Sequence, residues 1–360
     1  METILNSGLS ITRWRKKYFR DYVRDSRFAP YMGEGLDSII VKMYELQTEA
    51  GKTIIVPFVG KLTGSGVSGS QVLEGNEEDL GTGSMPVTVD WRRNAVIVPK
   101  SEQHKTDIDL LNAAKPELKR WEAVSLRADI IRELGAITVN DASLSTIAYA
   151  SATEGQKDTW LGLNTDRIIF GKDLANTSGT DHSASLANID TTNDRANYAL
   201  VTKLKRMAKE ADITPYQSDQ AAGEEWFVLF VGTRAFRDLE NDPTIQQIDR
   251  EARARGVGSG NPLFQGGDLL VRGVIVREEP EIPVYAGVGN SGSDVEPMYL
   301  AGGGAVAVAW GQMPKFPTRL TDYDFRKGVA VEELLGVKKI HENGVQRSIV
   351  TAYVSAPADS

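Results

Sequence analysis

A glycine-rich stretch between two strand-like segments constrains this chain more than any other feature. Residues 61–86 read KLTGSGVSGSQVLEGNEEDLGTGSMP. TIIVPFV precedes this stretch, and apolar residues at 87, 89 and 91 follow it with the alternation of a strand that continues over 94–98. Loops longer than about 15 residues are uncommon inside compact domains and are usually functional or disordered. The sequence therefore predicts a long β-hairpin with an overlong loop.

The loop carries side chains that a purely solvated linker does not need. Leu62, Val72 and Leu73 are apolar, and Glu74 and Glu77 are acidic. This combination favours docking of the loop onto another molecule. We expect these five residues to contact that molecule.

The same glycines allow an alternative interpretation. Gly64, Gly66 and Gly69 have the spacing of a dinucleotide-binding turn. In such a turn the third glycine opens a helix whose backbone amides hold the pyrophosphate. Further glycines and Pro86 interrupt the segment where that helix should lie. A nucleotide-binding enzyme remains an alternative that rests on the glycine spacing alone.

The N-terminal region is a second candidate interface. The pattern of residues 10–28 predicts a short amphipathic helix, because the aromatic residues Trp14, Tyr18 and Tyr22 recur every four residues. Seven basic and two acidic residues between positions 13 and 27 give a local charge of +5. An arm that bridges subunits fits the aromatic stripe and the acidic interruptions. A non-specific DNA-binding module over residues 13–27 is the alternative.

Composition narrows the chemistry that the chain can perform. Its 360 residues carry a net charge of −8 and include no cysteine, which excludes disulfides, thiolate metal ligands and cysteine nucleophiles. The three histidines, His104, His182 and His341, lie in unrelated segments without the spacing of a zinc site. We therefore expect no catalytic residue, no cofactor and no metal site. We also expect no membrane segment, because no run of 18 apolar residues occurs.

Helix and strand patterns mix along the rest of the chain without a regular βαβ alternation, which predicts an α+β protein. The clearest helix is predicted over 115–140, with an apolar face formed by Leu118, Trp121, Val124, Ala128, Ile131 and Leu134. The polar composition of 151–195 predicts irregular or inserted structure. Two strands are predicted over 329–354, around an Asn-Gly turn at 343–344.

Several of these segments together resemble the major capsid proteins of N4-like tailed bacteriophages. They are LEGNEE at 73–78, DY at 322–323, RKGVAVEELLGVKK at 326–339, and NG at 343–344. The resemblance covers most of the chain, and it is strongest over 28–145 and 298–345. It implies a structural protein without catalytic residues.

The resemblance implies the Hong Kong 97-type capsid fold. We then expect the following division: an N-terminal arm at 1–48, an extended loop at 49–105, a peripheral domain with a spine helix at 106–148, an axial domain at 149–310 with a possible insertion at 151–195, and a return to the peripheral domain at 311–360. The implied function is self-assembly into hexamers and pentamers of an icosahedral shell around double-stranded DNA, without sequence-specific DNA contacts. A separate scaffolding protein and a portal are the expected partners. The shell would be assembled in the host bacterial cytoplasm and would become the capsid of the virion.

Overall fold

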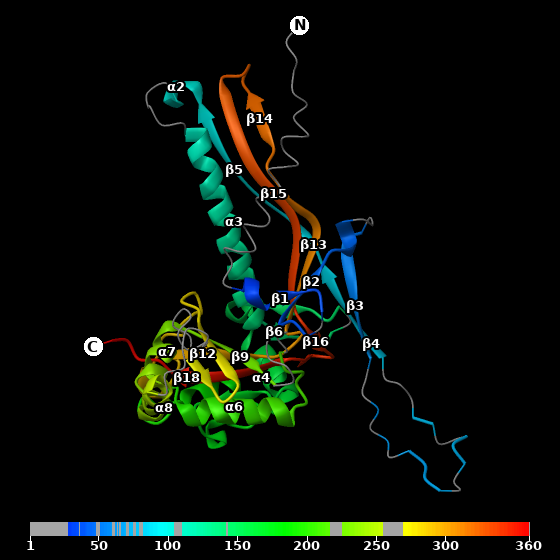
Figure 1. Cartoon of the computed structure of the whole chain (residues 1–360), viewed down its shortest axis with the longest axis vertical. Coiled ribbons are helices and arrows are strands. Elements are labelled where there is room, and N and C mark those ends of the chain that lie inside the picture. The colour runs from blue at the N-terminus through cyan, green and yellow to red at the C-terminus, as the bar shows by residue number, and fades with distance from the viewer. Residues whose placement is uncertain are drawn as a thin grey trace.

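The chain forms two lobes, each built on a six-stranded sheet (Figure 1). The computed structural model describes residues 28–35, 37–47, 51–59, 62, 64, 66–69, 72–74, 77–78, 82–103, 110–141, 143–216, 225–254 and 269–359. The predicted N-terminal helix lies outside the described residues, as do Trp14, Tyr18 and Tyr22. No described helix has both the length and the apolar character needed to span a membrane.

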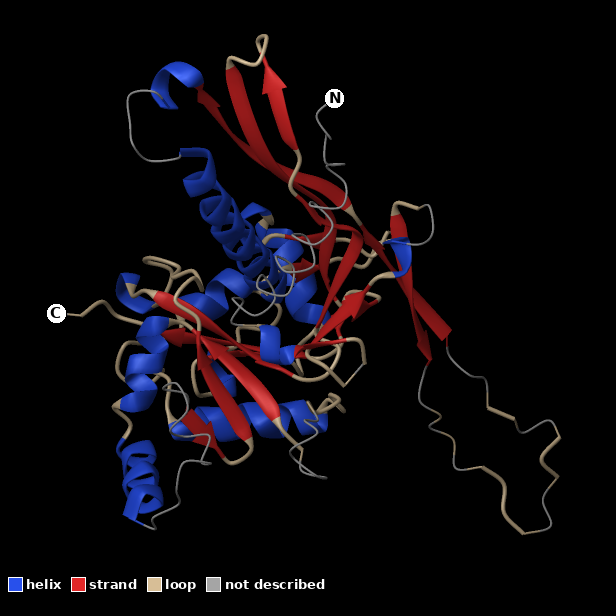
Figure 2. Cartoon of the chain, turned by 45° about the horizontal axis from the view of Figure 1, so that its top comes forward, coloured by secondary structure: helices blue, strands red, loops and turns tan. Residues whose placement is uncertain are grey.

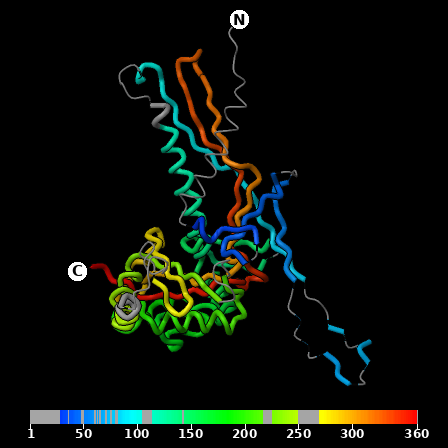
Figure 3. The backbone as a smooth tube through the Cα atoms, in the orientation of Figure 1, coloured from blue at the N-terminus to red at the C-terminus, as the bar shows by residue number. Residues whose placement is uncertain are grey.

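The first lobe is elongated and has one long strand at its centre. That strand is β15, Arg326–Lys339, which pairs with β5 along one edge and with β13 and then β14 along the other. Figure 3 shows β5 and β15 running side by side toward the far end of this lobe. The remaining strands of this sheet are β1 Met32–Gly33, β2 Ile40–Met43, β5 Asp90–Pro99, β13 Val306–Lys315 and β14 Thr318–Thr321.

A long helix, α3, lies along this sheet. It runs from Leu110 to Leu134 rather than over the predicted 115–140, and the short helix α2, Lys100–Gln103, precedes it. The predicted apolar face is wrong in part, because Val124 is 40% exposed and Ala128 is exposed as well. The buried face instead repeats every four residues, at Leu118, Glu122, Leu126, Ile130 and Leu134.

A buried ion network explains why an acidic residue lies on that face. Arg92 on β5 donates from Nη1 to Asp129 Oδ2 at 2.6 Å and from Nε to Glu333 Oε1 at 2.6 Å. Burial raises the pKa of Glu333, and Arg92 and a hydrogen bond with Glu122 oppose that rise. These contacts connect α3 to β5 and β15. They determine which face of the helix is buried, and a pattern of apolar residues cannot predict such polar contacts.

The second lobe surrounds a mixed sheet with the strand order β10-β11-β9-β12-β18-β8. Its strands are β8 Ile168–Phe170, β9 Phe227–Val231, β10 Leu269–Val271, β11 Val274–Glu278, β12 Val295–Ala301 and β18 Ile349–Ser355. Alternate residues of β9 pack into two different cores: Phe227 with helix α6, Tyr198–Glu210, and Phe230 with Phe28 and α3. Because both faces of the sheet are covered, β9 is apolar throughout.

Two helices and a strand occupy the segment for which irregular structure was predicted. They are α4, Glu154–Leu163, then β8, which pairs in parallel with β18, and α5, His182–Ala187. The polar residues of this segment cap helices and turns, while Trp160, Leu161 and Phe170 form a core of their own. The expectation of irregular structure was therefore wrong.

The C-terminal strand also differs from its predicted place. β18 joins β12 and β8 in the second sheet, so residues 311–360 do not all return to the first lobe. The Asn-Gly turn forms, with φ of +49° at Asn343 and +83° at Gly344. It connects the short strands β16, His341–Glu342, and β17, Val345–Gln346, instead of pairing β15 with β18. The remaining elements are β6 Ile137–Thr138, β7 Thr146–Ile147, α7 Thr233–Glu240 and α8 Pro243–Ala254.

Candidate assembly surfaces

The predicted hairpin is present as β3, Thr53–Val59, and β4, Thr82–Thr88, which pair antiparallel from Thr53↔Thr88 to Val59↔Thr82. Side chains along β3 alternate strictly between buried and exposed. The buried set, Val56 among it, faces the first lobe, whereas Ile55 and Val59 are 64% and 61% exposed. A two-stranded hairpin with apolar side chains on both faces is unusual for a surface that meets only water.

The root of the hairpin is fixed to the first lobe. The buried face of β3 and β4 forms one core with residues of β2 and β13, together with Ile340. At Gly336 of β15, a Cβ atom would lie 2.3 Å from the carbonyl oxygen of Thr88, so only glycine allows β4 to pass this closely. The root therefore projects from the body in a defined direction.

Beyond its root, the hairpin extends away from both lobes (Figure 2). Leu62, Val72 and Leu73, three of the predicted contact residues, are 58–67% exposed in the loop. Together with Ile55 and Val59 they form what we call the hairpin surface. Glu74 and Glu77 are exposed in the same loop. The structure thus brings all five loop residues onto one projecting element.

The loop does not have the geometry of a nucleotide site. Gly66 and Gly69 have φ of +64° and +69°, and nothing lies within 4 Å of the position of an added Cβ atom at either residue. Gly64 donates its N–H to Glu78 Oε2 at 2.7 Å. The amide that would bind a phosphate is therefore already bonded to a carboxylate, which would also repel the phosphate. Among the described residues, the next element is strand β4 and not a helix. The dinucleotide interpretation was wrong.

A further apolar region lies at the far end of the first lobe, and it was not predicted. Ile97, Leu320 and Phe325 are large and exposed there, and Tyr323 is fully exposed. Tyr323 occupies the turn from β14 to β15, where three consecutive non-glycine residues, from Asp322 to Asp324, have positive φ. We call the end of the lobe that carries these four side chains the distal patch. Ile97 and Leu320 lie on opposite faces of the sheet there, because they pair with the adjacent residues Gly328 and Lys327 of β15. The sequence could not predict this region, because isolated exposed residues on strands and turns form no repeating pattern.

A cavity lined by residues of α3 and of the second lobe offers little chemistry. It has a volume of about 340 Å³ and lies between α3 and the second lobe, lined mainly by apolar side chains. Tyr149 and Tyr285, which stack at 4.4 Å, are part of that lining. Burial raises the pKa of both phenols far above the usual range, so both stay protonated. Protonated phenols in an apolar wall serve packing better than acid–base catalysis.

Comparisons with known proteins agree with a structural role. A sequence profile of the family described as phage capsid protein matches residues 2–353. The major capsid protein of Pseudomonas phage KPP25 is 26% identical over 373 aligned residues, which cover 96% of this chain and 95% of that protein. The chain in the capsid asymmetric unit of cyanophage Pam1 superposes with a TM-score of 0.85 and 36% identity, over 94% of both chains. The capsid protein of Ralstonia phage GP4 shares the fold, with a TM-score of 0.75 at 18% identity over 93% of this chain and 92% of that one.

The match extends over nearly the whole chain, through both lobes and the hairpin. Both surfaces expose large apolar side chains, which water alone does not favour. The chain therefore belongs to the phage capsid protein family and is a structural major capsid protein of a bacteriophage, with no enzymatic role.

Proposed function

We propose that this chain builds an icosahedral shell from hexamers and pentamers, with the Hong Kong 97-type fold and the N4-like affiliation that the sequence resemblance implies. The observation that carries the proposal is the hairpin surface, because its five apolar side chains project where the subunit itself cannot cover them. In an assembled shell, a neighbouring copy would lie against them. The distal patch would form a second contact at the other end of the first lobe.

The expected domain names follow from this proposal, with two changes. The hairpin would be the extended loop, α3 the spine helix, the first lobe the peripheral domain and the second lobe the axial domain. β18 would belong to the axial domain, because it pairs there with β12 and β8. Of residues 1–48, expected to be the N-terminal arm with Trp14, Tyr18 and Tyr22 as its contacts, β1 and β2 would belong instead to the peripheral domain, because they pair into the sheet of the first lobe.

The remaining partners are part of the same proposal. An exposed apolar hairpin is an aggregation hazard before assembly, which favours a separate scaffolding protein that controls when subunits meet. A portal would occupy one vertex, and double-stranded DNA would fill the shell without sequence-specific contacts. The net charge of −8 fits a container that does not bind its cargo tightly. Assembly would take place in the host cytoplasm.

The decisive experiment changes the exposed face of β3 alone. The double variant Ile55→Thr, Val59→Thr keeps strand propensity and the buried face, so the subunit should fold with unchanged stability but fail to form shells. Leu174→Thr is the matched control, because Leu174 is 60% exposed on the second lobe, away from both surfaces. Analytical ultracentrifugation and electron microscopy would report assembly. Normal shells from the double variant would refute the role of the hairpin surface.

A further inference from the structure

The outer edge of β5 is a long strand edge that no other strand covers. β5 runs from Asp90 to Pro99, and within the described part of the chain β15 is its only partner strand. Such an edge presents backbone N–H and C=O groups with which a strand from another molecule can pair. Native proteins usually protect edges of this kind, so the structure of this edge needs an explanation.

The sequence of β5 favours pairing with a second copy. Residues 95–98 read AVIV, an uncharged segment with high strand propensity. Arg92 reaches Asp129 on α3, so the odd-numbered residues of β5 face the opposite side of the sheet. Two of them, Trp91 and Ile97, are 51% and 60% exposed. A strand added along this edge would cover part of both side chains.

The backbone amides of β5 that point away from β15 can be identified from the pairing. In an antiparallel pair, successive residues direct their N–H and C=O groups alternately toward the partner strand and away from it. Val89, just before β5, donates its N–H to the carbonyl oxygen of Lys52 in the hairpin at 2.9 Å, and not to β15. By alternation, the outward amides of β5 belong to residues 91, 93, 95 and 97. The next outward position is Pro99, which has no N–H.

Local side chains bind two of these outward amides. Asp90 Oδ1 accepts from the N–H of Trp91 at 2.8 Å, and Asn94 Oδ1 accepts from the N–H of Ala95 at 2.8 Å. Bonds of this type compete with the ladder of a sheet. Together with Pro99, they leave every second outward position, at 91, 95 and 99, without a donor for an incoming strand. An exposed arginine, Arg93, lies between the two bonded amides.

We propose that Asp90, Asn94 and Pro99 protect the edge of β5 against strand addition by a second copy of this chain. Two side-chain bonds must break before another strand can pair along the edge, and Pro99 offers no bond at its end. Sheet-to-sheet dimers of unassembled subunits are thereby suppressed. The hairpin surface and the distal patch remain free for other contacts, and the protection does not depend on the geometry of any shell.

The first test measures amide hydrogen exchange by nuclear magnetic resonance in the full-length chain. All chains in this and the next test carry Ile55→Thr, Val59→Thr, so that the hairpin surface does not contribute to association. After correction for intrinsic rates, the amides of Trp91 and Ala95 should exchange roughly three- to tenfold more slowly than those of Arg93 and Ile97, as expected for one hydrogen bond each. Equal rates at the four amides would overturn the proposal.

The second test removes the two acceptors. Asp90→Ala, Asn94→Ala lowers strand propensity and adds little apolar surface, so increased association would not come from either property. In sedimentation velocity, this variant should form dimers with a dissociation constant about tenfold or more below that of the parent chain. Asp90→Asn, Asn94→Asp keeps an acceptor oxygen at both positions and the same net charge. This matched control should behave like the parent.

A third substitution locates the contact between the dimerising chains. Arg93→Pro removes the outward N–H at the middle of the edge and leaves the pairing with β15 intact, because proline is tolerated where the N–H faces solvent. Added to Asp90→Ala, Asn94→Ala, it should restore the dissociation constant of the parent, whereas Arg93→Gln should not. The proposal is overturned if removing the acceptors does not strengthen association, or if the matched control associates as strongly. It is also overturned if Arg93→Pro has no effect, or if Arg93→Gln restores the parent value equally well.

Discussion

Replacing Lys339 on β15 by methionine should change the stability of the subunit by an amount that depends on pH. The Lys339 side chain is completely buried between the two lobes. Its Nζ atom donates to the carbonyl oxygen of Ala136 at 2.7 Å and to Gln346 Oε1 at 3.3 Å, and it lies 5.8 Å above the Trp160 ring. Burial lowers its pKa from 10.5 to about 7, and the Glu133 carboxylate opposes that change only in part.

The sign of the effect follows from proton linkage. In the unfolded chain the amine has its ordinary pKa, so between about pH 7 and pH 10.5 the unfolded state binds more protons than the folded state. The penalty for the buried charge is fully developed at and below pH 7, and it decreases as the pH rises. At about 1.4 kcal/mol per pKa unit, the wild-type chain should gain roughly 2–3 kcal/mol relative to Lys339→Met between pH 7 and pH 9.

The methionine substitution also leaves two acceptors, Ala136 O and Gln346 Oε1, without their donor. That loss costs about 1–3 kcal/mol, but it is the same at every pH and does not affect the predicted slope. Lys339→Met should therefore be favourable or neutral near pH 6 and destabilising near pH 9. Lys327→Met, on an exposed position of the same strand, is the control and should show no such change of sign.

The assay is urea unfolding of unassembled subunits, carried out in the Ile55→Thr, Val59→Thr background so that assembly does not contribute to stability. Free energies of unfolding are compared at equal m-values for the three chains between pH 6 and pH 9. If the free energy of unfolding depends on pH in the same way with Lys339 and with Lys339→Met, folding does not lower the pKa of the amine. The reasoning from burial to pKa would then be refuted.

Three further predictions concern the two lobes and the hairpin root. Leu126→Ala on the buried face of α3 should lower the free energy of unfolding by about 2–5 kcal/mol, while Val124→Ala on the exposed face should stay within about 0.5 kcal/mol in the same urea titration. Burial raises the pKa of Glu296 to about 7, so stability that it contributes in acid is lost as the pH rises toward 7. Glu296→Gln should therefore gain roughly 2–3 kcal/mol relative to wild type between pH 5 and pH 8, and a constant difference would contradict this. Gly336→Ala should destabilise the hairpin root, because its Cβ would lie 2.3 Å from Thr88 O, and faster hydrogen exchange of the β4 amides would report it.

Local patterns predicted those elements whose neighbours are close in sequence. The hairpin followed from alternating apolar residues on both sides of the loop. The Asn-Gly turn at 343–344 was predicted for the same reason. In each case the residues themselves favour the conformation that they adopt.

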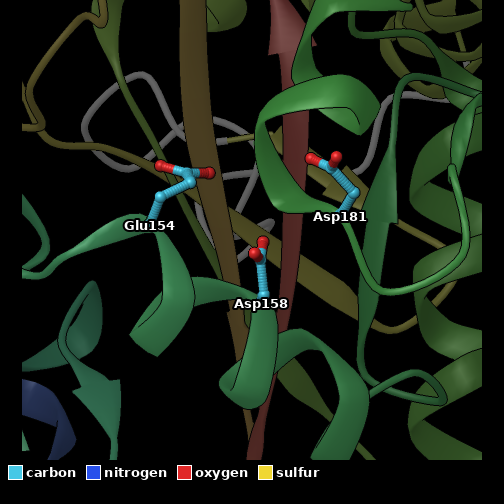
Figure 4. Close-up of side chains that lie close together, drawn as sticks. All are labelled: Glu154, Asp158 and Asp181. Carbon is cyan, nitrogen blue, oxygen red and sulfur yellow. The ribbon is translucent and has the colours of Figure 1, made fainter.

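Long-range polar contacts decided the features that the sequence did not predict. Glu122 lies on the buried face of α3 because Arg92 and Glu333 lie on distant strands. β18 leaves the first lobe because β12 and β8 offer it partners on both edges. Glu154 and Asp158 on α4 and Asp181 just before α5 likewise come together only in the fold (Figure 4). No periodicity marks such residues, since each has an ordinary local environment.

In the proposed shell, the exposed apolar area of the hairpin surface sets how strongly two subunits associate. Its five apolar side chains are about 60% exposed, and burying that exposed part would contribute roughly 1–2 kcal/mol each, or about 5–10 kcal/mol per hairpin. Association of two subunits costs about 4–15 kcal/mol in translational and rotational entropy. The free energy gained from one hairpin contact is therefore about equal to this cost. A closed ring has as many hairpin contacts as subunits, but its formation needs one association step fewer than the number of subunits. The distal patch would add another contact for each copy. Isolated pairs should therefore be weak while closed rings are stable, and this difference gives assembly its cooperativity.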